Sequence, residues 1–462
     1  MREGVPMGDG AVVHKPRRWW MMTLRSLQAL ALVVAVALLG GSLAACGTDP
    51  QTPAVPSPTP TDTAWTIAVL APLTGPRADE GRGLLQSVQT QVNLRSKSLK
   101  AAGLTVKVLA LDDRGQPSVG QQQATRLPDD ASVVAVIGGV TSLVNEGVQP
   151  ILNSAGLAMV APGGGAPWLT GRGTPARRAF STYFRLCAQD ADQGAAAAGR
   201  ALAQGDRRSV VLEDGSADHA AVSRSFVRTF SRTAGTAATR IRVDVGDAQA
   251  LPAATIDRIA ALKPQTVFLS VDAGDLPLIK ESLARGGVRP RLVTTLPKNS
   301  PATPIESPDV WTGVSAASIG ALPSTLPGRF PFATPTPTTE PVVEPGLFGA
   351  GGLDAASLIM DALIRARPTS SSVQPNATLT PTGSAVDGAT LSLRRQIVDS
   401  VSAASIKGAT GPVSFDSFGN ARSRPVGFFT YDGKAWVPQP AMIVRDGVVS
   451  RGVVSTEPRI SR

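Results

Sequence analysis

The chain has 462 residues, of which 42% are hydrophobic and 17% charged, so it is globular and large enough for two cores. Its formal net charge is +10, but the first 45 residues hold five basic and two acidic side chains of that balance. The other basic residues are scattered singly or in pairs such as Arg207-Arg208, which argues against nucleic-acid binding because that function requires a clustered basic face.

The amino terminus is arranged like a secretory signal peptide. Basic side chains between residues 15 and 25 precede an apolar run over 27–39, which is too short to span a bilayer. Small residues then lead to Leu43-Ala44-Ala45-Cys46, which resembles the lipobox of bacterial lipoproteins. We therefore expect removal of a signal peptide over 1–45 and lipidation of Cys46. The alternatives are an uncleaved anchor and cleavage without lipidation.

The segment that follows Cys46 predicts a tether. Residues 47–63 are rich in Pro, Thr and Ser and lack apolar periodicity, so we expect disorder over 46–64. The mature chain would then be extracytoplasmic and lipid-anchored to the cell membrane. A lipidated Cys46 leaves Cys187 as an unpaired thiol, which we expect to be a small buried side chain and not a reactive group.

From Trp65 onward, short apolar runs alternate with longer amphipathic stretches. The predicted strands are 66–70, 105–111, 133–137, 158–161, 209–212, 240–245 and 266–271. The predicted helices are 80–99, 119–127, 144–155, 189–203, 220–234, 253–262 and 276–285. Continuous apolar runs of this length are buried on both faces, so the alternation predicts parallel sheets flanked by helices, in an α/β doubly wound fold.

Two stretches interrupt this alternation. Residues 332–345 are rich in Pro and Thr, residues 367–388 are rich in Pro, Ser and Thr, and we expect both to be disordered surface insertions. Residues 352–365 between them have a helical apolar stripe. The insertions are therefore expected to flank a helix of the fold, not to separate two domains.

The first predicted strand and the turn after it, Ile67 to Gly75 (IAVLAPLTG), are similar to the opening of the solute-binding proteins of branched-chain amino-acid ABC transporters. Further matching segments follow in the same order: 111–113, 136–138 with 141–142, 156–157 leading to 160–163, 184–185 with 192–194, and 411–416 with Gly419. The similarity covers nearly all of residues 65–437. Its weight lies in the order and spacing of the segments, since no single motif is decisive.

This resemblance implies a type I periplasmic-binding fold, in which two Rossmann-like lobes are joined by a hinge of crossover strands. Lobe one would hold 65–184 and 312–420, and lobe two 185–311 and 421–458. The implied function is that of a lipid-anchored receptor that binds a small polar ligand, such as an amino acid or amide, between the lobes. Its partners would be the permease subunits of an ABC importer. An envelope sensor or interaction protein with the same fold is the alternative.

The candidate ligand-binding residues of lobe one follow predicted strands. Thr74 follows the first strand, and Thr141 and Ser142 lie between the third strand and the start of its helix, where backbone N–H groups suit an anion. The resemblance places a serine that holds the ligand carboxylate at Ser142; a purely local helix cap is the alternative.

A run of glycines, Gly163, Gly164 and Gly165, follows the next strand and is expected to expose backbone donors and leave room for a ligand. The resemblance predicts a small residue and a threonine hydroxyl where Gly164 and Gly165 stand. The sequence therefore predicts a weaker anion site here, built from the backbone.

Lobe two departs further from the resembled family. Asp272 replaces an aromatic that typically covers the ligand, and Leu296 and Lys298 stand where an ammonium-binding carboxylate is expected. Both changes argue against an aliphatic amino acid bound in the usual pose. Asp218 and Asp272 could supply negative charge for a cationic ligand, and the alternative is that both are solvated loop acids.

Enzymatic function is not supported by the sequence. The chain contains two histidines, His14 and His219, and His14 would be lost with the signal peptide. A Ser-His-Asp arrangement would therefore have to use His219. We found no Cys/His cluster, phosphate-binding loop or complete dinucleotide fingerprint. Asp112 and Asp113 could form an acidic site, but a local hydrogen-bonding role fits them better. We expect a binding protein with no cofactor and no metal.

Overall fold

The computed structural model describes residues 64–244, 250–296, 308–326, 345–368 and 386–452. The expected signal peptide, Cys46 and nearly all of the tether lie outside these residues, as do Lys298 and most of both expected insertions. Within the described part of the chain, no helix is both long enough and apolar enough to cross a membrane.

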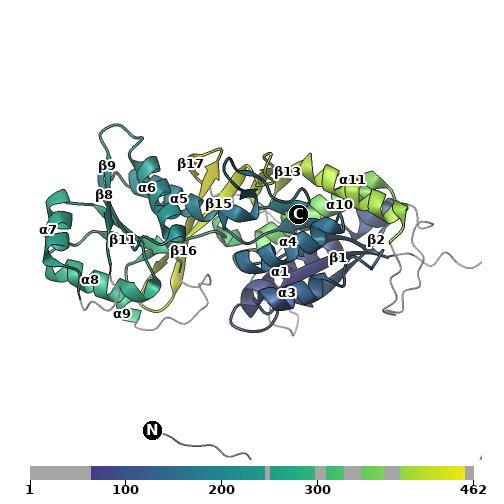
Figure 1. The fold of residues 1–462 in the computed structure, drawn as a ribbon, viewed down its shortest axis with the longest axis horizontal. Helices are drawn as coiled ribbons and strands as arrows, with labels where there is room; N and C mark the ends of the chain where they lie inside the picture. Colours follow the sequence, from purple (N-terminus) through teal and green to yellow (C-terminus); the bar gives the residue numbers. More distant parts are fainter. Residues whose placement is uncertain (1–63, 245–249, 297–307, 327–344, 369–385, 453–462) are drawn as a thin grey trace, which may run out of the picture. The chain divides into compact units, whose positions relative to one another are not determined.

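The first sheet is parallel and has the strand order β2-β1-β3-β4-β7. Its strands are β1 (Ala64–Ala71), β2 (Thr105–Asp112), β3 (Val133–Gly138), β4 (Ala158–Ala161) and β7 (Tyr183–Arg185). Its helices are α1 (Ala78–Leu94), α2 (Ser96–Ala101), α3 (Pro117–Ala124), α4 (Ser142–Ser154), α10 (Gly349–Ala366) and α11 (Gly388–Ser402). Figure 1 shows α1, α3, α4, α10 and α11 around these strands.

Alternate residues of β1 pack against helices on opposite faces of the first sheet. Ile67 and Val69 belong to a cluster with side chains of α1, α10 and α11. Ala68 and Leu70 belong to another cluster with side chains of α4. A strand covered on both faces needs apolar residues at consecutive positions, which explains the run that predicted it.

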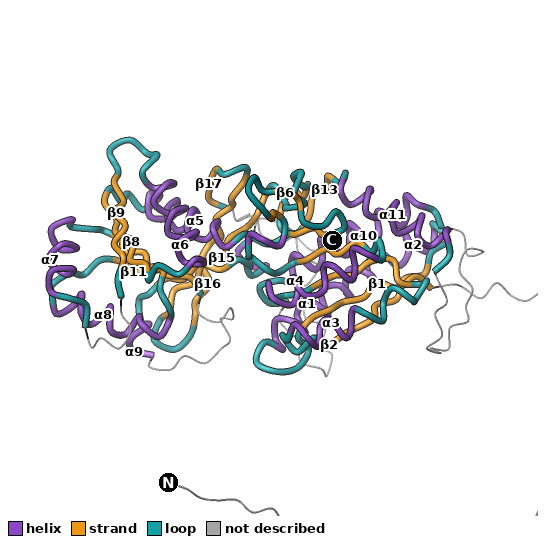
Figure 2. The backbone as a smooth tube through the Cα atoms, viewed as in Figure 1, coloured by secondary structure: helices purple, strands orange, loops and turns teal. Residues whose placement is uncertain are grey.

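The second sheet has the order β17-β16-β15-β12-β11-β10-β8-β9. Its parallel part consists of β8 (Arg208–Glu213), β9 (Ala237–Arg242), β10 (Thr266–Ser270), β11 (Arg291–Thr295) and β12 (Ser315–Ser318). The antiparallel strands are β15 (Ser423–Tyr431), β16 (Trp436–Arg445) and β17 (Val448–Arg451). The helices are α5 (Asp190–Ala203), α6 (Ala217–Phe230), α7 (Ala253–Leu262), α8 (Leu276–Arg285) and α9 (Pro308–Trp311). Figure 2 shows these strands with helices beside them.

Two small antiparallel hairpins complete the described strands. The first pairs β5 (Gly171–Arg172) with β6 (Arg177–Arg178), and the second pairs β13 (Ser405–Gly408) with β14 (Gly411–Ser414).

Three crossover segments connect the two sheets, after β7, β12 and β14, and hydrogen bonds join them to one another. Ala188 N donates to Ile319 O at 3.1 Å, and Ala421 N donates to Arg185 O at 2.8 Å. This arrangement matches the expected hinge of crossover strands.

The predicted alternation of strands and helices is confirmed, with differences at some boundaries. The strand predicted at 240–245 is β9, three residues earlier, and the helix predicted at 80–99 is split at Arg95 into α1 and α2. Residue 312 was the expected start of the second part of lobe one, but β12 pairs with β11 and β15 in the other sheet. The assignment of residues 315–318 to lobe one is therefore wrong.

Candidate functional site

Each sheet has a point where the chain leaves two neighbouring strands in opposite directions. In the first sheet the chain runs from β1 to β2 on one side and from β3 to β4 on the other. Ligands of open α/β sheets bind beyond the carboxyl ends of the strands at such a point, because the two following loops diverge there. The loops after β1 and β3 contain Thr74, Thr141 and Ser142, three of the predicted residues.

Thr74 is exposed but already has a partner within the fold. Its hydroxyl donates to Asp112 Oδ2 at 2.6 Å, and the backbone N–H groups of Leu73 and Thr74 donate to Asp112 Oδ1 at 2.8 and 3.3 Å. Desolvation opposes ionisation of Asp112, but the hydrogen bonds from Thr74, Arg114 and Leu73 outweigh it and lower its pKa. Asp112 is thus a local hydrogen-bond acceptor that shapes the loop carrying Thr74.

Thr141 and Ser142 begin helix α4. Thr141 Oγ1 accepts a hydrogen bond from Val144 N at 3.3 Å, which is the geometry of a helix N-cap. Ser142 Oγ accepts from Ala166 N at 3.1 Å and so joins the loop after β3 to the loop after β4. Both side chains are partly exposed, and their contact with a ligand stays a prediction.

The three glycines are buried, and protein atoms fill the space beside them. A Cβ at Gly163 would lie 2.5 Å from Val140 O, one at Gly164 would lie 2.4 Å from Asn145 Nδ2, and one at Gly165 would lie 2.1 Å from Asp190 Oδ1. Gly164 also has a φ of +92°, which disfavours any larger residue. The run therefore permits close packing of the loop, and the expected room for a ligand is occupied by protein.

Asn145 holds this edge of the sheet together and was not anticipated from the sequence. Its buried side chain accepts from Gly139 N at 2.6 Å and donates to Gly163 O at 2.9 Å and Tyr183 Oη at 3.2 Å. An asparagine in the first turn of a helix that follows a glycine-rich loop was the available signal.

Two buried carboxyl groups lie behind the loop after β1. Burial raises the pKa of Glu80 to about 7, even though Arg77 donates to its Oε2 at 2.7 Å and opposes the shift. Burial likewise raises the pKa of Asp113 to about 6, and its Oδ2 has no hydrogen-bond partner among the described residues. Both groups are enclosed by the lobe and do not form an exposed acidic site.

The second sheet has its divergence point between β8 and β10. The chain runs from β8 through α6 to β9 on one side, and from β10 through α8 to β11 on the other. Because β8 and β10 are parallel neighbours, the loops after them meet at one edge. Asp272 lies exposed in the loop after β10. Asp218 lies in the first turn of α6, and its side chain is outside the described set.

Asp272 lies beside Asp214 and His219. His219 Nδ1 and Asp214 Oδ2 form a hydrogen bond of 2.7 Å, and Ser216 N donates to Asp214 Oδ1 at 2.8 Å. One ligand atom from each of Asp214, His219 and Asp272 lies within 4.8 Å of those of the other two. The sequence did not point to Asp214, although an acidic residue directly after a buried strand was an available signal; Asp272 was singled out only because it replaces an aromatic of the resembled family.

The electrostatics at this edge are acidic. Burial opposes ionisation of Asp214, but hydrogen bonds from Ser216 and His219 outweigh it and lower its pKa. Burial, and then the negative charges of Asp272 and Asp214, raise the pKa of the nearby Asp275. Three acidic side chains, Asp214, Asp272 and Asp275, therefore influence one another at this edge of the second sheet.

Leu296, at a position where a carboxylate was considered, is buried, and its N–H donates to Ala317 O at 2.7 Å. It packs within the fold and supplies no charge.

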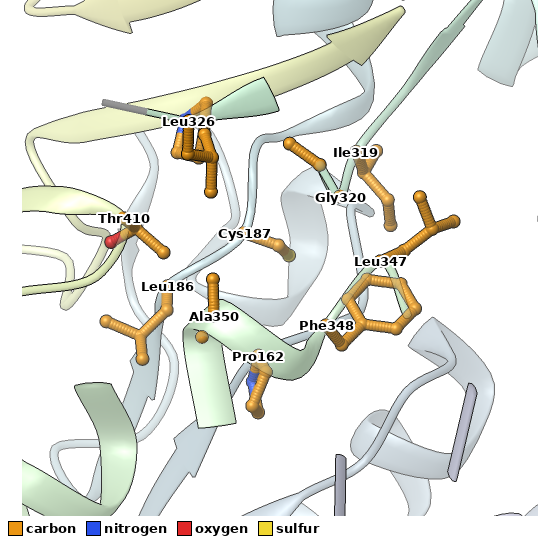
Figure 3. A pocket seen from close by; sticks show the side chains of 13 residues that line it. Pro162, Leu186, Cys187, Ile319, Gly320, Leu326, Leu347, Phe348, Ala350 and Thr410 are labelled. Atoms are coloured by element: carbon orange, nitrogen blue, oxygen red, sulfur yellow. The ribbon is translucent and has the colours of Figure 1, made fainter. Parts of the chain in front are cut away.

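An apolar recess lies among the crossover segments (Figure 3). Its lining includes Pro162, Leu186, Cys187, Ile319 and Phe348. Cys187 is buried, its Sγ donates to Gly164 O at 3.5 Å, and burial raises its pKa to about 12. The prediction of a small buried thiol is confirmed, and the recess has too few polar groups to orient a polar solute.

The sequence of the chain matches a protein family model and two relatives. The family model described as periplasmic binding protein matches residues 64–435. A Leu/Ile/Val-binding protein homolog 3 of Brucella melitensis is 33% identical over 150 residues, covering 32% of this chain and 39% of the relative. Leu/Ile/Val-binding protein BraC3 of Rhizobium johnstonii is 32% identical over 167 residues, covering 36% and 44%. The chain thus matches less than half of the length of these relatives.

Solved structures share the fold over a larger span. A leucine-binding protein LivK from Thermotoga maritima has a TM-score of 0.52 and 21% identity, covering 84% of this chain and 98% of the other. The substrate-binding protein LivJ of Streptococcus pneumoniae, solved with isoleucine, has a TM-score of 0.52 and 16% identity, covering 83% and 99%. A solute-binding protein of Rhodopseudomonas palustris, solved with benzoate, has a TM-score of 0.51 and 16% identity, covering 85% and 98%. All the relatives named here are binding proteins and none is an enzyme.

Proposed function

The chain belongs to the periplasmic binding protein family, and we propose that it is the solute receptor of an ABC importer, capturing a small polar solute between two lobes without chemical change. The observation that carries this proposal is the pair of divergence points, one in each sheet, with polar side chains in the loops beyond them. Three crossover segments link the sheets, which suits closure around a ligand that contacts both lobes.

The two edges differ in the chemistry they offer. The edge of the first sheet presents the start of α4 with the side chains of Thr141 and Ser142, which suits a carboxylate or another electron-rich group. The edge of the second sheet presents Asp214 and Asp272, which suits a cationic group. A solute that carries both kinds of group, such as an amino acid, an amide or a related amine, fits this polarity.

Asp272 and Leu296 differ from the residues expected at these positions of the family, and this difference bears on which solute binds. Relatives of this fold include one solved with isoleucine and one solved with benzoate, so the fold alone does not select the ligand. An acidic edge in place of an aromatic cover favours a polar or cationic end on the solute over an aliphatic side chain.

We further propose that Cys46 carries a lipid anchor that holds the receptor at the outer face of the membrane, beside its permease subunits. The order of charge, apolar run and small residues before Cys46 supports this. Labelling of cells with a radioactive fatty acid should mark the wild-type chain and leave Cys46→Ser unmarked. Incorporation into the variant would overturn the proposal.

An envelope sensor with the same fold but without transport is the second candidate, supported by the apolar packing of Leu296 where a ligand carboxylate was considered. A thermal-shift screen of the full-length protein separates the two, with amino acids, amides, small organic acids and polyamines as the panel. A receptor should gain a melting-temperature increase that grows with solute concentration, because a ligand that binds only the native state stabilises it. Failure of the whole panel to shift a cooperatively melting protein would favour the sensor.

A further inference from the structure

The side chains of Asp214, His219 and Asp272 converge from two different loops of the second sheet. Asp214 directly follows β8, His219 lies in the first turn of α6, and Asp272 follows β10. One ligand atom from each lies within 4.8 Å of the other two. Asp272 lies 58 residues after Asp214 and 53 after His219, and they meet here because β8 and β10 are parallel neighbours whose following helices diverge.

We infer that these three side chains form a binding site for one divalent transition-metal ion of the zinc class. Imidazole nitrogen and carboxylate oxygen are ligands that such ions accept, and two carboxylates with one neutral imidazole balance a doubly charged ion. Metal–ligand bonds of about 2.0–2.2 Å place neighbouring ligand atoms roughly 3.4 Å apart in tetrahedral geometry, which requires only small adjustments within this group.

The hydrogen bond between His219 and Asp214 fits this role. At 2.7 Å it brings Nδ1 of the imidazole next to the carboxylate oxygen that would share the ion, and the ion would take the place of the proton between these two atoms. Ser216 N holds the other oxygen of Asp214 at 2.8 Å, and Ser216 Oγ caps α6 by accepting from His219 N at 3.4 Å. These bonds hold the carboxylate of Asp214 and the first turn of α6, which carries His219, before a metal binds, as second-shell bonds do in metal sites.

Charge at the site favours a cation. Arg242 packs against Gly215, but within the described residues it forms no ion pair with Asp214 or Asp272. Asp272 is exposed, so the site is accessible to an ion from solvent. Three protein ligands leave at least one coordination position open. If the proposed receptor function holds, a chelating solute would fill that position from the proposed solute-binding edge.

The test is calorimetric titration of the full-length protein, carrying no histidine tag, with Zn²⁺ alone. The wild type should bind one ion, and His219→Ala and Asp272→Asn should each weaken binding at least tenfold. Asp399→Asn is the matched control, since it removes an exposed carboxylate from α11 in the other lobe. Absence of saturable binding by the wild type, or equal affinity in all four proteins, would overturn the inference.

Nuclear magnetic resonance can detect metal binding at His219 directly, because the imidazole signal would not respond to Zn²⁺ if these side chains had only a structural role. The chain contains two histidines, so the imidazole signal of His219 is identified by its absence from His219→Ala. Zn²⁺ should shift that signal in the wild type, and Asp272→Asn should need at least tenfold more Zn²⁺ for the same shift. If His219→Ala fails to fold, Asp272→Asn still decides, because its side chain is exposed. A wild-type His219 signal unaffected by saturating Zn²⁺ would contradict the site.

Solute binding is measured separately, with and without a chelator. If a solute binds the wild type with the same affinity in the presence and absence of the chelator, and binds His219→Ala equally well, the receptor function stands. The same result would overturn the idea that a metal ion connects the solute to the protein. Zinc binding by a wild-type protein that binds none of the solutes in the screen would support the metal site and count against the receptor.

Discussion

The guanidinium of Arg185 donates two hydrogen bonds to Asn420 Oδ1, at 3.0 and 2.6 Å, and both residues are buried. Arg185 also donates to Gly164 O at 3.2 Å and Ala166 O at 2.7 Å. One side chain thus joins two of the crossover segments to the loop after β4. The loop that presents Ser142's partner, Ala166, is held in place from the hinge.

Replacement of Arg185 by Leu should therefore lower the free energy of unfolding by about 3 kcal/mol or more, because several buried acceptors lose their donor. Urea denaturation measures this change. Arg422→Ala is the control, because Arg422 is about half exposed and forms only a surface ion pair with Asp446. A loss for Arg185→Leu no larger than that for Arg422→Ala would show that the buried network is unimportant.

Glycine at position 165 is predicted to be required for packing. An added Cβ would meet Asp190 Oδ1 at 2.1 Å and Ile319 Cγ2 at 2.9 Å, so Gly165→Ala should destabilise by about 1–3 kcal/mol. Gly388→Ala is the matched control, since nothing lies within 4 Å of its added Cβ and it begins α11, where alanine is favourable. Equal melting temperatures of the two variants would contradict this interpretation of the glycine run.

The sequence predicted the elements that bury continuous apolar runs, because such runs leave few alternatives to a strand covered on both faces. The elements it missed include β7, β11, β12, whose residues Ser315–Ser318 have no large apolar side chain, and α11, which begins where the expected insertion ends. Tertiary pairing determines β12. Hydrogen bonds to its neighbours β11 and β15 hold it in the sheet, although its composition does not predict a strand.

For the site, the sequence identified the loops but not the partners within them. Asp272 was grouped with Asp218, whose side chain lies outside the described set, and the choice of Asp214 and His219 as its neighbours was not anticipated. That choice depends on which strands are neighbours and on the phase of α6 after its cap at Ser216, and neither is visible in a single sequence. The glycines after β4 were singled out for ligand binding, and the structure shows protein atoms packed closely beside each of them.

Glu80 should make stability fall as pH rises. Its pKa is about 7 in the folded chain against an ordinary value of 4.5, so the folded state holds the proton more tightly than the unfolded state. The unfolding free energy should then decrease between about pH 4.5 and 7, by on the order of 3 kcal/mol from this group. Glu80→Gln should flatten that decrease in urea denaturation across this range. An identical pH profile for both proteins would refute the assignment.

Cys187 should resist alkylation in the native protein. Its thiol is buried and its pKa of about 12 leaves almost no thiolate at pH 8, while unfolding restores ordinary reactivity. Mass spectrometry of the peptide that contains Cys187, after iodoacetamide treatment with and without urea, measures this directly. Rapid labelling of the native protein would show that the crossover segments open readily.

The most direct test of the receptor function is calorimetric titration of the strongest solute from the screen into the wild type, Ser142→Ala, Asp272→Asn and Asp399→Asn. If the solute contacts both sheets, Ser142→Ala and Asp272→Asn should each raise Kd at least tenfold, while Asp399→Asn, which changes an exposed residue of α11, keeps the wild-type Kd. Wild-type affinity in both Ser142→Ala and Asp272→Asn would contradict a solute site formed by these two edges.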